Sequence, residues 1–293
     1  MTKLTKQEVA VELDRLMSET GKNMETINHY ISLQKQEDVD IKHLIQVISK
    51  YVDDADLRME LGLHGFCACM MSRLSKVTKR MYGKEVWEQI FGGLEIPKTG
   101  WTSLTMIERQ DFALSIQNKF ASVASLDDYK RALEAVSRTW VSKDGSIGTT
   151  KKEVTLSDLD AFIRECNENH VNYHGTDRTA MEEFDSEKWK TRREGSKITV
   201  VQIPFLKQKY LLETDEKMKR YYACRCPWVR TSILKGETVS ASFCHCSLGY
   251  QKQGFETFFG RELDARIVRT VIEDGALECV FEIDIPDDVM MGH

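Results

Sequence analysis

The sequence predicts an α+β fold, in which a helical N-terminal half precedes a smaller half that carries an antiparallel sheet. Apolar residues recur at helical spacing through much of residues 5–174. After residue 195 the pattern changes to short stretches rich in β-branched residues. The polar, glycine-containing segment 142–150 (SKDGSIGTT) indicates a linker. We therefore expect a helical domain over residues 1–145 and a cysteine-rich α+β domain over residues 146–293.

Amphipathic patterns place the helices of the first half and the start of the second. Ser125 is the expected N-cap of one of them, with Asp127 and Asp128 in its first turn. Gly21 and Gly83 are expected to end two others. The expected helices cover residues 5–18, 38–52, 56–82, 106–122, 126–141 and 156–174.

The second half alternates between strand and helix patterns. Residues 197–204 (KITVVQIP), 263–271 and 277–285 are expected strands, and the turn EDGA between the last two suits a hairpin. A short helix is expected over residues 250–260, ending at its glycine. Alternate residues of the last strand are apolar, which places them on the core side of the sheet. These residues are Cys279, Phe281, Ile283 and Ile285.

The composition of the 293-residue chain excludes several classes of protein. Hydrophobic residues make up 41% and charged residues 30%, which is typical of a globular protein. The net charge of -5 argues against a general nucleic-acid-binding protein, which would show a strongly basic face. No stretch has the length and apolarity of a signal peptide or a membrane-spanning helix. We expect a cytoplasmic protein without a membrane or nucleic-acid partner, in which thiols stay reduced.

Two Cys-x-Cys pairs are the main candidate site. Cys224 and Cys226 are separated from Cys244 and Cys246 by 17 residues. In extended strands, residues two apart share a face, so each pair would present both sulfur atoms to one side. Four thiolates suit a tetrahedral zinc ion. The alternatives are inert or redox-active thiols, or an iron–sulfur or haem site.

Other cysteines and histidines are secondary candidates. Cys67 and Cys69 lie in a helical pattern that separates their side chains. His64 and Cys67 share a face of that helix and would line a pocket. The alternative is that Cys67 is only a small buried hydrophobic residue. Cys166, His170 and His174 recur every four residues, as additional metal ligands or a general base would. A solvated helix end explains that second group equally well.

A basic stretch, KWKTRREGSK, covers residues 188–197. Such a stretch usually forms a solvated face. Its alternative is a site for phosphate or for an acidic partner.

The segment 224–286 resembles a group of bacterial and archaeal cysteine-rich proteins. The resemblance is carried by FCHCSLGY (243–250), FETFFG (255–260) and CVF (279–281). The closing pattern is similar to that of 4-vinyl reductase small-molecule-binding domains and, more distantly, of L-2-amino-thiazoline-4-carboxylate hydrolase-like proteins. The resemblance implies an α+β domain with a ligand pocket and, in some members, a cysteine-bound metal. The chain departs from it at EDGALEC (273–279), where the relatives have Gly-Asp before the cysteine, so only the metal role of the four cysteines is carried over.

The leading functional hypothesis is a zinc-binding protein with a small-molecule-binding pocket, in which the zinc is structural. A hydrolase that acts on a small amide or cyclic amidine is the second hypothesis, with His245, His170 or His174 as its base. A thiol redox or regulatory protein is the third. The sequence has no G-x-S-x-G, H-E-x-x-H, phosphate-loop or G-x-G-x-x-G motif, so the common hydrolase and nucleotide-binding mechanisms have no support.

Overall fold

The computed structural model describes residues 70–96, 106–139, 147, 153–173, 187–226, 228–273 and 275–291. The helices expected over residues 5–18 and 38–52 lie outside this part of the chain, as do the start of the helix expected over residues 56–82 and almost all of the expected linker. The described residues fall within one compact unit, Cys69–Lys98 together with Ser103–His293.

Four long helices form where the amphipathic patterns predict them. They are α6 (Met70–Phe91), α7 (Met106–Val123), α8 (Leu126–Arg138) and α9 (Leu156–Tyr173). Ser125 caps α8 as expected, because its Oγ accepts a hydrogen bond from the backbone N–H of Asp128 at 3.0 Å. The helical backbone is interrupted at Gly83, as expected, with φ 85° and ψ 174°, and a second helical stretch of α6 follows this kink.

The sheet is antiparallel and contains β1 (Arg192–Glu194), β2 (Lys197–Gln202), β3 (Ala265–Arg269) and β4 (Cys279–Asp284) in the order β1-β2-β4-β3. The three predicted strands and the antiparallel pairing of the last two are confirmed. Cys279, Phe281, Ile283 and Ile285 are all buried, as their alternation predicted. Together with the helices, this sheet makes the fold α+β.

Several short helices lie in the second half of the chain, together with one longer helix, α14, that differs from its prediction. They are η1 (Glu187–Trp189), α11 (Lys207–Leu212), α12 (Glu216–Ala223), α13 (Thr231–Lys235), η2 (Ala241–Cys244) and α15 (Asp287–Met290). The helix expected over residues 250–260 is α14 (His245–Phe259), which begins five residues earlier and ends at Gly260 as predicted. The earlier start places the second Cys-x-Cys pair in helical backbone.

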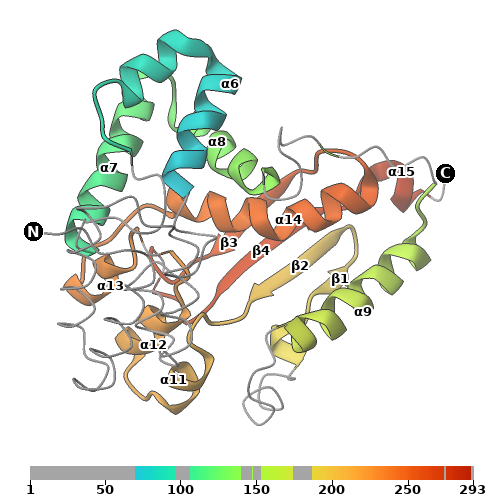
Figure 1. Cartoon of the computed structure of the whole chain (residues 1–293). Coiled ribbons are helices and arrows are strands. Elements are labelled where there is room, and N and C mark those ends of the chain that lie inside the picture. Colours follow the sequence, from blue (N-terminus) through green and yellow to red (C-terminus); the bar gives the residue numbers. More distant parts are fainter. Residues whose placement is uncertain are drawn as a thin grey trace, which may run out of the picture. The chain divides into compact units, whose positions relative to one another are not determined.

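Helix α14 lies between α8 and the sheet, because it contacts α8 as well as β3 and β4 (Figure 1). The approach to α8 is close: a Cβ atom at Gly249 would lie 2.6 Å from the Cα and carbonyl oxygen of Glu134. Only glycine fits there without a shift of one helix. Helix α8 precedes the expected domain boundary at residue 145 and α14 follows it, so this packing crosses that boundary. The division into a domain of residues 1–145 and a domain of residues 146–293 stays a prediction.

Candidate functional site

The two Cys-x-Cys pairs have different backbone conformations. Cys224 ends α12 with extended angles, φ -69° and ψ 123°, and Cys226 follows it outside any helix. Cys244 is the last residue of η2 and has helical angles, φ -74° and ψ -8°, while Cys246 lies in the first turn of α14. The expectation that both pairs occupy strands is therefore wrong. Residues two apart in a helix point about 200° from one another, so Cys244 and Cys246 do not share a side as they would in a strand.

The fold nevertheless brings cysteines from three segments together. Burial raises the pKa of the Cys244 thiol well above its usual range, and neighbouring Cys279, Cys224 and Cys226 raise it further. Burial likewise raises the pKa of Cys279 to about 12, with Cys224 adding to the effect. The pKa of Cys224 is also raised, mainly by burial. The end of α12, the η2–α14 junction and the start of β4 thus meet at a group of five thiols, which we call the thiol cluster (Cys224, Cys226, Cys244, Cys246 and Cys279). Cys224, Cys244 and Cys279 are buried, whereas Cys226 and Cys246 are half-buried.

Tyr129 of α8 joins the thiol cluster. Its side chain is fully buried, and burial followed by the charges of Cys226 and Cys246 raises the pKa of its phenol. The rings of Phe120 and Phe243, with centroids 5.4 and 5.9 Å away, pack against it. Within the described residues its hydroxyl has no hydrogen-bond partner. A buried hydroxyl without a partner is costly, so the position beside two sulfur atoms calls for an acceptor.

Sequence patterns did not find two members of this site. Cys279 has the alternation of an ordinary core strand residue, and Tyr129 lies on the apolar face of an amphipathic helix. Neither residue lies close enough in sequence to a Cys-x-Cys pair for the spacing to indicate a shared site. Only the C-x-F element of the resemblance pointed to Cys279, and nothing in the sequence pointed to Tyr129.

The side chains of the thiol cluster are not arranged as a metal site. Within the described ranges, no group of three or more His, Cys, Asp or Glu side chains is placed to hold one metal ion. The six described cysteines are thiols rather than disulfides. Thiolate ligands around a metal would therefore require the side chains to rotate toward a common centre.

The remaining predicted ligands either lie away from the thiol cluster or lie outside the residues that the structure describes. Cys166 is half-buried in α9, where burial and Glu165 raise its pKa to about 11. His170 belongs to α9, but its side chain lies outside the described residues, and so does His174. His64 and Cys67, the predicted pocket residues, lie outside them as well.

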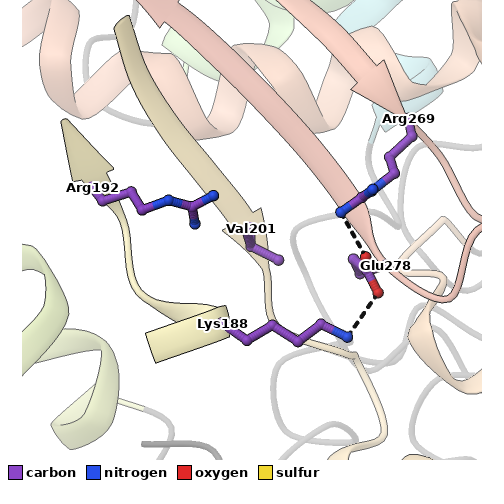
Figure 2. Close-up of a pocket in the computed structure, with 5 residues that line it drawn as sticks. All are labelled: Lys188, Arg192, Val201, Arg269 and Glu278. Carbon is purple, nitrogen blue, oxygen red and sulfur yellow. Dashed lines mark ion pairs between the residues drawn. The ribbon is translucent and has the colours of Figure 1, made fainter. Parts of the chain in front are cut away.

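A cavity of about 340 Å³ lies elsewhere, on the sheet (Figure 2). Its described lining consists of one apolar and four charged residues: Lys188, Arg192, Val201, Arg269 and Glu278. None of these residues was a predicted pocket residue, although Lys188 and Arg192 belong to the basic stretch at residues 188–197.

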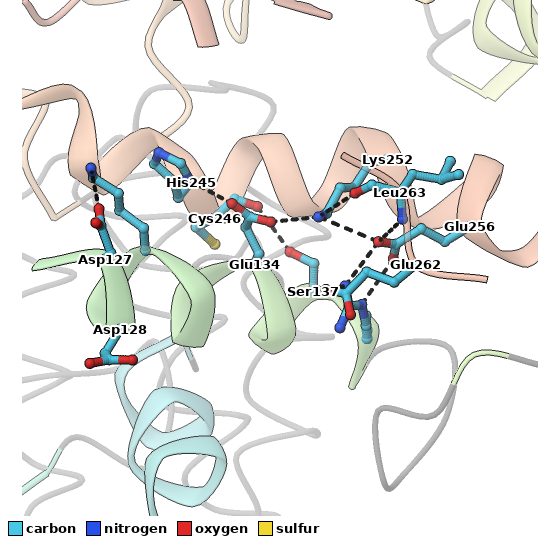
Figure 3. Close-up of polar contacts among 12 residues, drawn as sticks. Asp127, Asp128, Glu134, Ser137, His245, Cys246, Lys252, Glu256, Glu262 and Leu263 are labelled. Atoms are coloured by element: carbon cyan, nitrogen blue, oxygen red, sulfur yellow. Dashed lines mark hydrogen bonds and ion pairs between the residues drawn. The ribbon is translucent and has the colours of Figure 1, made fainter. Parts of the chain in front are cut away.

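His245 faces α8 rather than a cysteine partner. Its Nδ1 lies 2.6 Å from one carboxylate oxygen of Glu134, and Lys252 Nζ lies 2.6 Å from the other (Figure 3). Burial opposes ionisation of Glu134, but the hydrogen bond with His245 and the charge of Lys252 outweigh it and hold the pKa of Glu134 below its ordinary value. A carboxylate that holds one ring nitrogen fixes the orientation of the imidazole.

This contact continues as a buried charged network between α8 and α14 (Figure 3). Lys252 Nζ donates to the carbonyl of Leu263 at 3.1 Å and lies 3.4 Å from Glu256. The Arg138 guanidinium donates two hydrogen bonds of 2.9 Å to the Glu256 carboxylate. Each buried charge of the network therefore has an opposite partner, so none is left uncompensated at the contact between the helices.

The fold and this cluster define a helix-rich α+β protein with a buried thiol cluster beside a charged interhelical network. Comparison with known proteins gave no match: no family model fits the sequence, and no characterised protein or solved structure matches it significantly. Among the helices of the described segments, none combines the length and apolarity needed to cross a membrane.

Proposed function

We propose that this protein binds one zinc ion through thiolates of the thiol cluster, with Cys224, Cys226, Cys244 and Cys246 as the leading ligand set, and that the zinc is structural. The observation that carries the proposal is the buried Tyr129 hydroxyl beside Cys226 and Cys246, which has no hydrogen-bond partner within the part of the chain that the structure describes. A thiolate accepts a hydrogen bond much better than a thiol does. Metal binding would therefore supply the acceptor that the phenol requires.

The chemistry of the donors is consistent with a metal that binds with loss of protons. Burial raises the pKa of Cys224 and Cys244, so these thiols stay neutral unless a cation compensates for their charge. A bound divalent ion provides that compensation and deprotonates the coordinating thiol. Cys279 is a fifth donor in the same cluster and would replace a ligand that cannot rotate into place.

A ligand set of four thiolates leaves no open position on zinc, so it favours a structural role. Such a site would join the end of α12 to the start of α14. The small-molecule-binding role expected from the resemblance would then belong to a separate pocket.

A hydrolase is the second candidate, because one observation favours it. The Glu134–His245 contact of 2.6 Å orients an imidazole next to the cysteines, as the carboxylate partner of a general base does. In that function the substrate would be a small amide or cyclic amidine. A thiol redox function has less support, since reactive cysteines have lowered pKa values and these thiols have raised ones.

Elemental analysis of the chain purified under reducing conditions tests the proposal. We expect one equivalent of zinc, and its loss in Cys244→Ser. Cys166→Ser is the matched control, because Cys166 lies on α9 outside the thiol cluster, and it should keep the metal. Less than about half an equivalent, with all 8 thiols titratable, would contradict metal binding.

A further inference from the structure

The cavity on the sheet gathers cations from separate elements. Lys188 comes from η1, Arg192 from β1 and Arg269 from the end of β3 (Figure 2). Two of these residues belong to the basic stretch at 188–197, which the thiol cluster does not use. A solvated basic face does not require its cations to converge on one cavity, as these do.

Strand register explains why these side chains meet. Arg192 pairs with Thr199, while Val201 and Arg269 both pair with Val280. Residues two apart on a strand share a face, so Thr199 and Val201 lie on one side of β2, and Val200 lies on the other side with the hydrophobic core. Val200 lies on the sheet face that packs against the core, so the cavity is on the opposite face of the sheet.

Glu278 organises the charges of the cavity. Its side chain is only 10% exposed, and its two oxygens lie 3.0 Å from Lys188 Nζ and 2.8 Å from the Arg269 guanidinium. Arg192 pairs instead with Glu194, which does not line the cavity. Two cations thus share the Glu278 carboxylate, and the described lining carries three cations and one carboxylate.

The cations remain accessible to a ligand. The side chains of Lys188, Arg192 and Arg269 are 51%, 44% and 50% exposed. An ammonium has three donors and a guanidinium five, so pairing with one carboxylate leaves donors on each of them. Two guanidinium groups suit the planar, bidentate recognition of a carboxylate or phosphate.

We propose that this cavity binds a small organic anion through a carboxylate or phosphate group held by Lys188, Arg192 and Arg269. The volume of about 340 Å³ is at the lower end of small-molecule pockets, and Val201 supplies an apolar wall. The three proposed anion ligands are not members of the thiol cluster, but Glu278 of the cavity precedes Cys279 in the chain and its charge contributes to the raised pKa of that thiol.

Calorimetric titration with inorganic phosphate and, separately, with succinate tests this site, at an ionic strength held constant with sodium chloride. We expect saturable binding of at least one probe, and the tighter of the two identifies the group that the cavity prefers. Arg269→Gln should weaken that binding by about tenfold, the effect of one charge-assisted hydrogen bond. Arg266→Gln is the matched control: Arg266 lies on the same strand, pairs with Glu282 and does not line the cavity. It should change the affinity less than about twofold.

Glu278→Gln provides a test in the opposite direction. Removal of the shared carboxylate releases Lys188 and Arg269, so the probe should bind more tightly, whereas Glu282→Gln should have no effect. If Arg269→Gln does not fold cooperatively, Lys188→Gln gives the same comparison, because the Lys188 side chain is exposed. Absence of binding of both probes up to ~50 mM, or equal weakening by Arg266→Gln and Arg269→Gln, would overturn the proposal.

Discussion

Tyr129 illustrates what single residues contribute to the proposed metal site. Its ring is held by Phe120 and Phe243, and its hydroxyl lies near Cys226 and Cys246 without a partner among the described residues. An ordinary core would hold a phenylalanine at such a position, since an unpaired buried hydroxyl costs about 1–3 kcal/mol. A tyrosine there is reasonable if a thiolate accepts its hydrogen bond.

Tyr129→Phe should therefore have different effects on stability in the zinc-bound and metal-free forms of the protein. In the zinc-bound form the variant loses a hydrogen bond to a thiolate, and we expect its free energy of unfolding to fall by about 1–2 kcal/mol. In the metal-free form it loses only an unpaired hydroxyl, so its stability should be unchanged or slightly higher. Urea unfolding with and without zinc measures both values.

Tyr82→Phe is the control for that comparison. The Tyr82 hydroxyl donates to the carbonyl of Asp128 at 2.9 Å, so its removal should destabilise both forms equally. Equal stabilisation by Tyr129→Phe with and without zinc would show that its hydroxyl has no thiolate acceptor.

At the scale of elements, the sequence predicted most of the helices and strands whose apolar residues recur with a regular period. The long helices, the cap at Ser125 and the three longer strands followed from apolar periodicity and capping residues. The short β1 was missed because its residues, Arg-Arg-Glu, have no apolar alternation and pair only at the sheet edge. The start of α14 was missed because Cys-His-Cys was interpreted as a strand. Local pattern does not distinguish these states in so short a segment.

The candidate site was predictable only in part, for a related reason. The Cys-x-Cys pairs were visible as motifs, whereas Tyr129 and Cys279 reach the same place through contacts between distant segments. The interhelical network was also hidden, because Glu134 and His245 are 111 positions apart and look like ordinary surface residues in the sequence.

The contact between α8 and α14 gives a prediction at this scale. Gly249→Ala would place a Cβ atom 2.6 Å from the backbone of Glu134, so the helices must separate and the charged network must stretch. We expect a loss of about 1–3 kcal/mol in the free energy of unfolding, as in other overpacked cores. Gly254→Ala lies on the same helix with nothing within 4 Å of its new Cβ, and it should stabilise the protein by up to about 1 kcal/mol. Equal effects of the two substitutions in chemical unfolding would contradict the close approach.

At the scale of the molecule, the thiol cluster and the charged network attach α14 at its beginning and along its length. The network joins α14 to α8 through Glu134, Lys252, Glu256 and Arg138. The thiol cluster brings the start of α14 to the end of α12 and the start of β4. Because burial favours the neutral form of Cys224, Cys244 and Cys279, these three thiols do not repel one another in the metal-free protein, which is expected to stay folded.

Chelation of zinc should therefore lower stability without unfolding the chain at room temperature. A ligand present at 100 times its dissociation constant stabilises the folded state by about 2.7 kcal/mol, which corresponds to a decrease of roughly 5–10 °C in Tm when it is removed from a unit of this size. The loss should be local, because the metal would join only the segments that carry the cysteines. Hydrogen exchange should thus show weaker protection in α12, the first turns of α14 and β4, while α6 and α7 keep theirs and serve as the internal control. Unchanged Tm after chelation, or an equal loss of protection in all of these elements, would contradict a structural metal at the thiol cluster.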